Sequence, residues 1–142
     1  MREIVTEISI NATPNKVWNV LTNFYKHPEW NPFITAISGN KNVGEQIIVR
    51  MRPPESKGMT LKPVISKFEK NKEFRWKGKL FFKGLFDGEH YFKLSDNKNG
   101  TTTFIHGEYF SGVLVGLLRK TLKNTEVGFE LMNIALKKES EK

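Results

Sequence analysis

The chain has 142 residues, 38% of them hydrophobic, and a formal net charge of +8. That length and composition exclude an intrinsically disordered chain and are typical of one domain with a real hydrophobic core. There is no cysteine, which excludes disulfides, cysteine metal sites and thiol catalysis. The positive charge comes mostly from scattered lysines, which indicates a solvated surface, with an anionic ligand or membrane as the alternative. No nucleic-acid partner is expected, because the aromatic residues alternate into the core and form no exposed stacking platform.

The N-terminal segment, residues 3–10, alternates with a period of two. Ile4, Thr6, Ile8 and Ile10 share one face, which predicts a half-buried strand. The segment has no apolar run of the kind found in a signal peptide, and no stretch approaches the roughly 20 apolar residues of a membrane span. We therefore expect a cytoplasmic protein.

Two short helices should follow this strand. Thr13 can cap a helix whose first turn accepts Pro14, and Thr22-Asn23 reopens a turn. A second short helix is predicted over residues 24–30.

Residues 34–110 read as strands separated by turn signals such as Ser38-Gly39-Asn40. Six strands are predicted, at residues 34–38, 45–51, 59–70, 73–82, 86–95 and 101–110. No crossover helix separates them, so the sheet should be antiparallel.

The chain ends in a predicted helix over residues 113–138. Its apolar positions recur every three or four residues and form one stripe. They are Leu114, Leu118, Leu122, Thr125, Phe129, Met132 and Leu136. The whole chain, residues 1–142, is then a single α+β domain in which a seven-stranded curved sheet surrounds this helix and encloses a hollow.

Three strings of residues resemble the START-related (SRPBCC) superfamily, which includes the birch-pollen allergen, polyketide cyclases and lipid-transfer domains. The first is residues 17–33, VWNVLTNFYKHPEWNPF, in which Asn23 stands where the family often has aspartate. The second is GEHYF at 88–92 followed by HGEYFSG at 106–112, and the third is residues 128–137. The second and third strings are similar to a bacterial branch of this superfamily. The resemblance implies a helix-grip fold and an internal cavity, but it does not imply one activity.

Polar residues gather on one predicted hairpin. A turn centred on Lys98 would place His90 opposite His106 and Phe92 opposite Phe104. Even-numbered residues then share a face with Glu108. Phenylalanines dominate that face, so it should point inward: they are Phe86, Phe92, Phe104 and Phe110.

Two imidazoles and a carboxylate in an apolar wall must pair with one another, with water or with a ligand. His90, His106 and Glu108 are therefore candidates for a structural hydrogen-bond network, for a polar ligand anchor, or for acid–base catalysis. A metal site is not expected, because the third histidine, His27, lies far away in the sequence and no close ligand spacing occurs. No cofactor is expected either.

The predicted ligand-binding set combines this face with aromatic residues elsewhere and with the helix stripe. It consists of Trp30, Phe33, Trp76, Phe86, His90, Phe92, Phe104, His106, Glu108, Phe110, Leu118 and Phe129. The aromatic segment from Leu80 to Phe86 could line the cavity mouth or touch a membrane, or it could pack under the first helices.

The leading hypothesis is that the chain binds or transports a small hydrophobic molecule of lipid, polyketide or aromatic type. The first alternative is a cyclase- or dehydratase-like enzyme in which one of the polar groups moves a proton. The second is a protein-interaction module, like the chaperone-activator relatives, that uses its outer surface.

Overall fold

The structure is a computed structural model that describes residues 2–80, 86–112, 115–117 and 119–142. The elements, in chain order, are β1 (Arg2–Ile10), α1 (Pro14–Thr22), the 3-10 turn η1 (Phe24–Lys26), α2 (His27–Trp30), β2 (Ile34–Ser38), β3 (Ile48–Met51), β4 (Met59–Leu61), β5 (Val64–Glu69), β6 (Glu73–Leu80), β7 (Phe86–Asp96), β8 (Thr102–Ser111), the 3-10 turn η2 (Val115–Leu117) and α3 (Arg119–Ser140).

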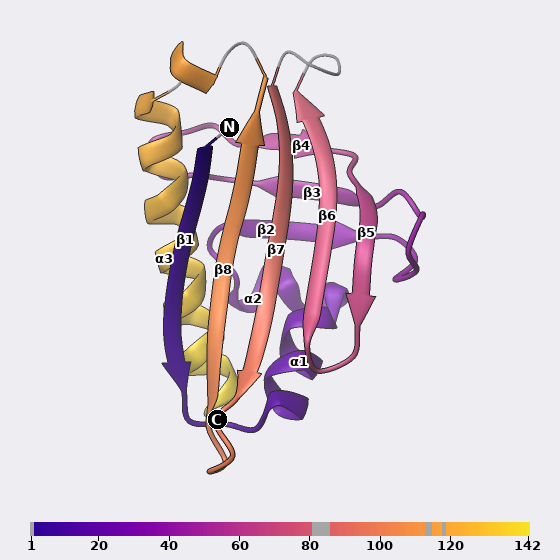
Figure 1. The fold of residues 1–142 in the computed structure, drawn as a ribbon, viewed down its shortest axis with the longest axis vertical. Helices are drawn as coiled ribbons and strands as arrows, with labels where there is room; N and C mark the ends of the chain where they lie inside the picture. The colour runs from indigo at the N-terminus through magenta and orange to yellow at the C-terminus, as the bar shows by residue number, and fades with distance from the viewer. Residues whose placement is uncertain (1, 81–85, 113–114, 118) are drawn as a thin grey trace.

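The strands form two antiparallel sheets. The larger has the order β1-β8-β7-β6-β5, and the smaller has the order β2-β3-β4. Figure 1 shows the five long strands in front and β2, β3 and β4 crossing behind them. A bridge between Gln46 and Val64 connects the two sheets.

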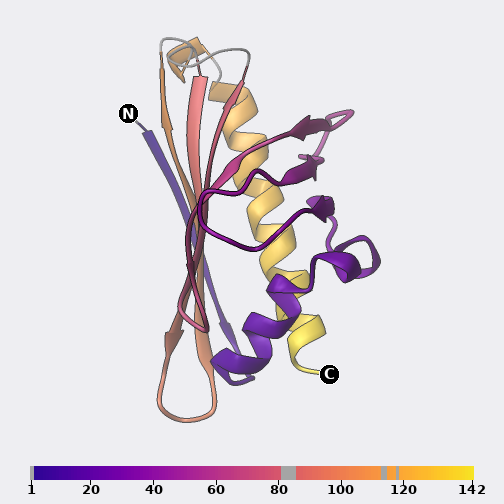
Figure 2. The same cartoon turned by 90° about the vertical axis from the view of Figure 1, so that its right-hand side faces the viewer.

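All the helices lie on one side of the larger sheet. Figure 2 shows α3 running along that side, with α1, α2 and the smaller sheet beside it. This arrangement is the helix-grip fold, and the α+β prediction is confirmed. No helix in the described ranges is both long enough and apolar enough to cross a membrane.

The strand count differs from the prediction by one. The run predicted at 59–70 is two strands, β4 and β5, because Pro63 has no backbone N–H for a ladder and interrupts the pairing. The chain passes from the smaller sheet to the larger one at this point. The prediction of one seven-stranded sheet therefore becomes eight described strands in two sheets.

The C-terminal helix also begins later than predicted. Its α-helical part starts at Arg119 and runs to Ser140, whereas the apolar pattern predicted residues 113–138. The 3-10 turn η2 precedes it, and that turn contains Gly116, a residue that disfavours an α-helix. Leu114 and Leu118 of the predicted stripe lie outside the described residues.

The register of the β7–β8 hairpin is shifted from the prediction. His90 lies opposite Glu108, Phe92 opposite His106, and Leu94 opposite Phe104. The predicted pairs of His90 with His106 and of Phe92 with Phe104 are therefore wrong, because the loop between Asp96 and Thr102 is centred on Asn99 and not on Lys98. The shift is by two residues, so the side chains stay on the predicted face.

The inner face of the large sheet carries an aromatic core. Trp76 stacks on His90 with ring centroids 4.9 Å apart, and His106 stacks on Phe129 of α3 at 4.1 Å. Phe33, which follows α2, meets Phe129 edge-to-face at 5.4 Å. These contacts join the sheet, α3 and the segment before β2 in one packed cluster.

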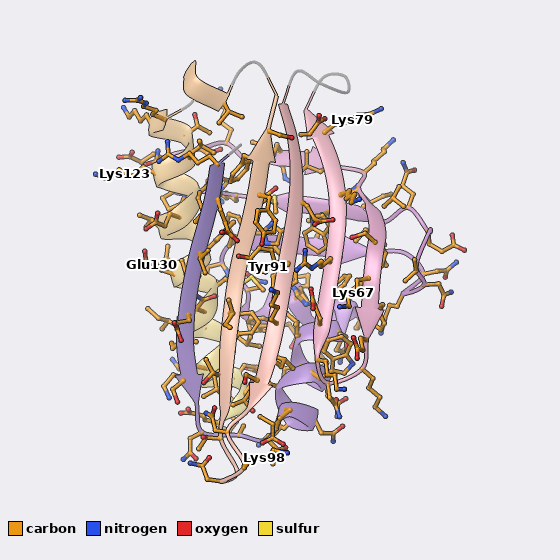
Figure 3. All side chains as sticks on the ribbon, in the orientation of Figure 1. Lys67, Lys79, Tyr91, Lys98, Lys123 and Glu130 are labelled. Carbon is orange, nitrogen blue, oxygen red and sulfur yellow. The ribbon has the colours of Figure 1, made fainter. Side chains whose placement is uncertain are left out.

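The outer face of the same sheet is polar. Tyr91 lies in the middle of that face, toward the viewer in Figure 3. Its hydroxyl donates to Glu3 Oε2 at 2.6 Å, and Arg75 lies 5.0 Å from its ring centroid. The ring of Tyr91 covers Gly107 and occupies the space where a Cβ would lie. The ring of Tyr91 therefore packs against the backbone of β8 on the outer face of the sheet.

Candidate functional site

Three predicted polar residues meet on the inner face of β7 and β8. His90 Nε2 lies 2.7 Å from His106 Nε2, and His90 Nδ1 lies 3.1 Å from Glu108 Oε1. Both are within hydrogen-bonding distance. The contacts follow from the register, since Glu108 is the direct partner of His90 while His106 lies diagonally across from it.

Two residues that were not predicted extend this network. His106 Nδ1 lies 2.9 Å from Asn133 Oδ1 on α3, and Asn133 Nδ2 donates to Thr6 Oγ1 on β1 at 2.8 Å. Thr6 in turn donates to the carbonyl of His106 at 2.8 Å. The sequence contained one usable signal, because Thr6 is polar at an inward position of an otherwise isoleucine face.

Burial determines the charge states of the two histidines. Both side chains are fully buried. Burial lowers the pKa of His90 to about 3, and it lowers the pKa of His106 well below the usual value, with the neighbouring His90 adding to the effect. Both rings are therefore neutral at pH 7.

Glu108 differs from the histidines because it is partly open. Its side chain keeps 15% exposure, whereas that of His90 keeps none. Burial raises the pKa of the Glu108 carboxyl to about 8, so it holds its proton at pH 7. Glu108 Oε2 lies over Gly88, so close to the backbone that a Cβ there would collide with it. Glycine at position 88 makes room for the carboxyl.

Most of the predicted ligand-binding residues form packed core. Those that are buried are Phe33, Trp76, His90, Phe92, Phe104, His106, Phe110 and Phe129. Glu108 and Trp30 are partly buried. The side chain of Phe86 and all of Leu118 lie outside the described residues. The structure thus brings His90, His106, Phe33 and Phe129 together, and direct ligand contact by any of the set stays a prediction.

The third histidine, His27, belongs to a separate network. His27 Nε2 donates to the carbonyl of Leu21 at 2.7 Å, and its Nδ1 accepts from Asn31 at 3.1 Å. Asn31 Oδ1 accepts from the backbone N–H groups of Phe33 and Ile34, each at 2.9 Å. Burial lowers the pKa of His27 to about 4. Every end of this network is a backbone group.

Three clefts in the described surface are lined by residues other than the predicted binding set. One of these, about 820 Å³, lies on the outer face of the large sheet and is bordered by Lys77, Glu89 and Tyr109. Within the described ranges, no three histidine or acidic side chains are placed to hold a metal ion. Most of the predicted membrane-contact segment, residues 81–85, is outside those ranges.

The chain is similar to known proteins in both its sequence profile and its fold. A family profile described as "Polyketide cyclase / dehydrase and lipid transport" matches residues 1–137. No curated protein matches the sequence. Among solved structures, the Zhui aromatase/cyclase from Streptomyces sp. R1128 is 11% identical, with a TM-score of 0.78 over 99% of this chain and 93% of that one.

Two further solved structures have the same architecture. A norcoclaurine synthase point mutant from Thalictrum flavum is 12% identical, with a TM-score of 0.74 over 98% of this chain and 93% of that one. Ara h 8.0201 is 16% identical, with a TM-score of 0.64 over 95% of this chain and 97% of that one. At these identities the similarity establishes the fold alone.

Proposed function

The chain belongs to the polyketide cyclase / dehydrase and lipid transport family, and we propose that it binds a small, largely apolar molecule between the large sheet and α3, with Glu108 as its polar contact. The observation that carries this proposal is the position of Glu108. It is the partly exposed end of a hydrogen-bonded chain whose two histidines are fully buried.

The packing of the interior favours one end of the sheet. Around His106 and Phe129 the rings stack closely, so the centre has little room for a ligand. Glu108 lies near the end where β7 begins and β8 ends, the upper end in Figure 1. Gly88 has no side chain, and the carboxyl of Glu108 lies over it on the inner face. An apolar ligand here would gain about 25 cal/mol per Å² of buried surface before the costs of binding.

The neighbouring structures support a small-molecule site. The norcoclaurine synthase mutant was solved in complex with a transition-state analogue. We also propose that the protein is cytoplasmic and does not bind nucleic acid. Residues 80–86 are the segment that would contact a membrane transiently.

Native mass spectrometry of the purified protein tests the binding function. We expect a stoichiometric adduct of a few hundred daltons, on the order of the size that a pocket of this kind encloses. Glu108→Ala should lower its occupancy, while Glu7→Gln, at an exposed position of β1, should not. Unchanged occupancy in Glu108→Ala would exclude Glu108 as the polar contact.

A second function is favoured by the position of Glu108, whose carboxyl lies at the end of the buried histidine chain, 3.1 Å from His90 Nδ1. Burial raises the pKa of this carboxyl to about 8, which suits a general acid at neutral pH. A cyclase- or dehydratase-like reaction would use that proton. Glu108→Gln keeps a hydrogen-bonding side chain but cannot release a proton. It should abolish turnover of the molecule identified by mass spectrometry while binding is retained. Full turnover in the variant would exclude this role.

A further inference from the structure

The directions of the hydrogen bonds in the buried network can be assigned from Thr6. The one hydroxyl hydrogen of Thr6 is donated to the carbonyl of His106. Thr6 Oγ1 must then accept from Asn133, which places the amide nitrogen of Asn133 toward Thr6. The amide oxygen consequently faces His106 Nδ1 at 2.9 Å and accepts its hydrogen.

The orientation of the Asn133 amide also fixes the hydrogen positions on both imidazoles. Since neutral His106 carries its hydrogen on Nδ1, its Nε2 is bare and can only accept. The 2.7 Å contact between the two Nε2 atoms is therefore a donation from His90. Neutral His90 then has a bare Nδ1, and the 3.1 Å contact with Glu108 Oε1 requires a hydrogen on that oxygen. All five hydrogen bonds run in one direction.

We infer that Glu108 meets the ligand with Oε2 as a hydrogen-bond acceptor, and that the ligand is an uncharged apolar molecule with a hydroxyl group, such as a phenol or an alcohol. The inference rests on the proposed function and names the ligand class of that site. Because the hydrogen on Oε1 is donated to His90, Oε2 is a carbonyl oxygen.

Other polar groups fit this site less well. A ligand carbonyl would place two acceptors against each other, and a carboxylate would add an unpaired buried charge. An ammonium group would need an ionised partner, but Glu108 is hydrogen-bonded here as a neutral acid. A hydroxyl donates to Oε2 and leaves the rest of the network unchanged.

Matched naphthalene probes test the inference by isothermal titration calorimetry at pH 6.5. We expect 2-naphthol to bind about tenfold more tightly than 2-methoxynaphthalene, in which the hydroxyl hydrogen is replaced by a methyl group, and more tightly than 2-naphthoate. Equal or tighter binding of the ether or the carboxylate would overturn the inference.

Variants at two positions make the test specific to the carboxyl. Glu108→Gln should keep the preference for naphthol, since its amide can donate to His90 and present its oxygen to the ligand. Glu108→Leu should bring the naphthol-to-ether affinity ratio close to one. Gly88→Ala should do the same, because its methyl group displaces Oε2. A preference that survives in Glu108→Leu would overturn the inference.

The outcomes separate the two proposals. If the probes bind without preference for the hydroxyl, the ligand class is wrong and the binding function stands. If no probe binds and native mass spectrometry shows no adduct, the binding function fails, and the inference fails with it. Thermal unfolding of each variant confirms that it is folded before titration.

Discussion

The protein contains two buried histidine networks, and they end differently. The network of His27 and Asn31 joins residues close in sequence and ends at backbone groups on every side. The network of His90 and His106 joins β1, β7, β8 and α3, and one of its ends is the partly exposed carboxyl of Glu108. Both keep neutral imidazoles, but only the second ends in a group that another molecule could reach. Burial of histidine alone therefore does not distinguish a binding site from a structural brace.

The largest expected effect is on the pH dependence of stability, and it belongs to the second network alone. Below pH 4.5 the Glu108 carboxyl is protonated in both the native and the unfolded state. Between pH 4.5 and about 8 only the native state keeps that proton, so rising pH favours unfolding by about 1.4 kcal/mol per unit. The advantage of Glu108→Gln over the natural protein should therefore grow by on the order of 4 kcal/mol from pH 4.5 to pH 9.

Urea unfolding across that range measures this difference, in which the contributions of the histidines cancel. Glu7→Gln, at an exposed position, is the control and should show no growth with pH. If the difference in the free energy of unfolding between Glu108→Gln and the natural protein stays constant from pH 4.5 to pH 9, then Glu108 is ionised at neutral pH.

The next largest effect is expected in the first network. Asn31→Ala removes the donor to His27 and the acceptor for the N–H groups of Phe33 and Ile34. We expect a loss of about 3 kcal/mol in the free energy of unfolding, because buried groups lose their partners. Asn31→Asp keeps the acceptor and should lose less. Ligand binding per folded molecule should not change, and a specific loss of binding would mean that the two networks are coupled.

A smaller loss is expected when the second network is cut at α3. Asn133→Leu leaves His106 Nδ1 without its side-chain acceptor and should cost about 2 kcal/mol in urea unfolding. Ile134→Asn changes the neighbouring residue, which is 58% exposed, and should have little effect. If Asn133→Leu leaves the free energy of unfolding unchanged, the network contributes little to stability and its role is confined to ligand binding.

The smallest effect is expected for a hydrogen bond on the outer face. Tyr91→Phe removes the donor to Glu3, whose exposed carboxylate can be hydrated instead. Thermal unfolding should show a loss of at most about 1 kcal/mol. If Tyr91→Phe lowers the free energy of unfolding as much as Asn31→Ala does, then water does not replace the lost hydrogen bond at the exposed Glu3 carboxylate.

Most of the fold could be predicted because its signals are local. The alternation in residues 3–10, the turn residues between strands and the apolar stripe that includes Phe129 each reflect one element. The split at Pro63, the start of α3 and the hairpin register were predicted less well. They depend on which of two sheets a strand joins and on the loop that a hairpin adopts, and neither is encoded in periodicity.

The candidate site was predicted in part for the same reason. His90, His106 and Glu108 share parity, so even the wrong register left them on one face. Asn133 and Thr6 come from other elements, and their contact joins residues 127 positions apart. Such a contact depends on how α3 lies against the sheet, which the sequence pattern does not specify.

Gly107 separates His106 from Glu108, and the packing around it has a consequence for mutational tolerance. A Cβ at this position would overlap the hydroxyl and ring of Tyr91 and would lie 2.6 Å from the carbonyl of Ile4. By contrast, Gly116 has open space around it. If both codons were randomised and folded clones selected, position 107 should return almost only glycine, while position 116 should accept many residues. The residues found at position 107 in the selected clones would thus mark the segment of β8 that carries His106 and Glu108, before any ligand is known.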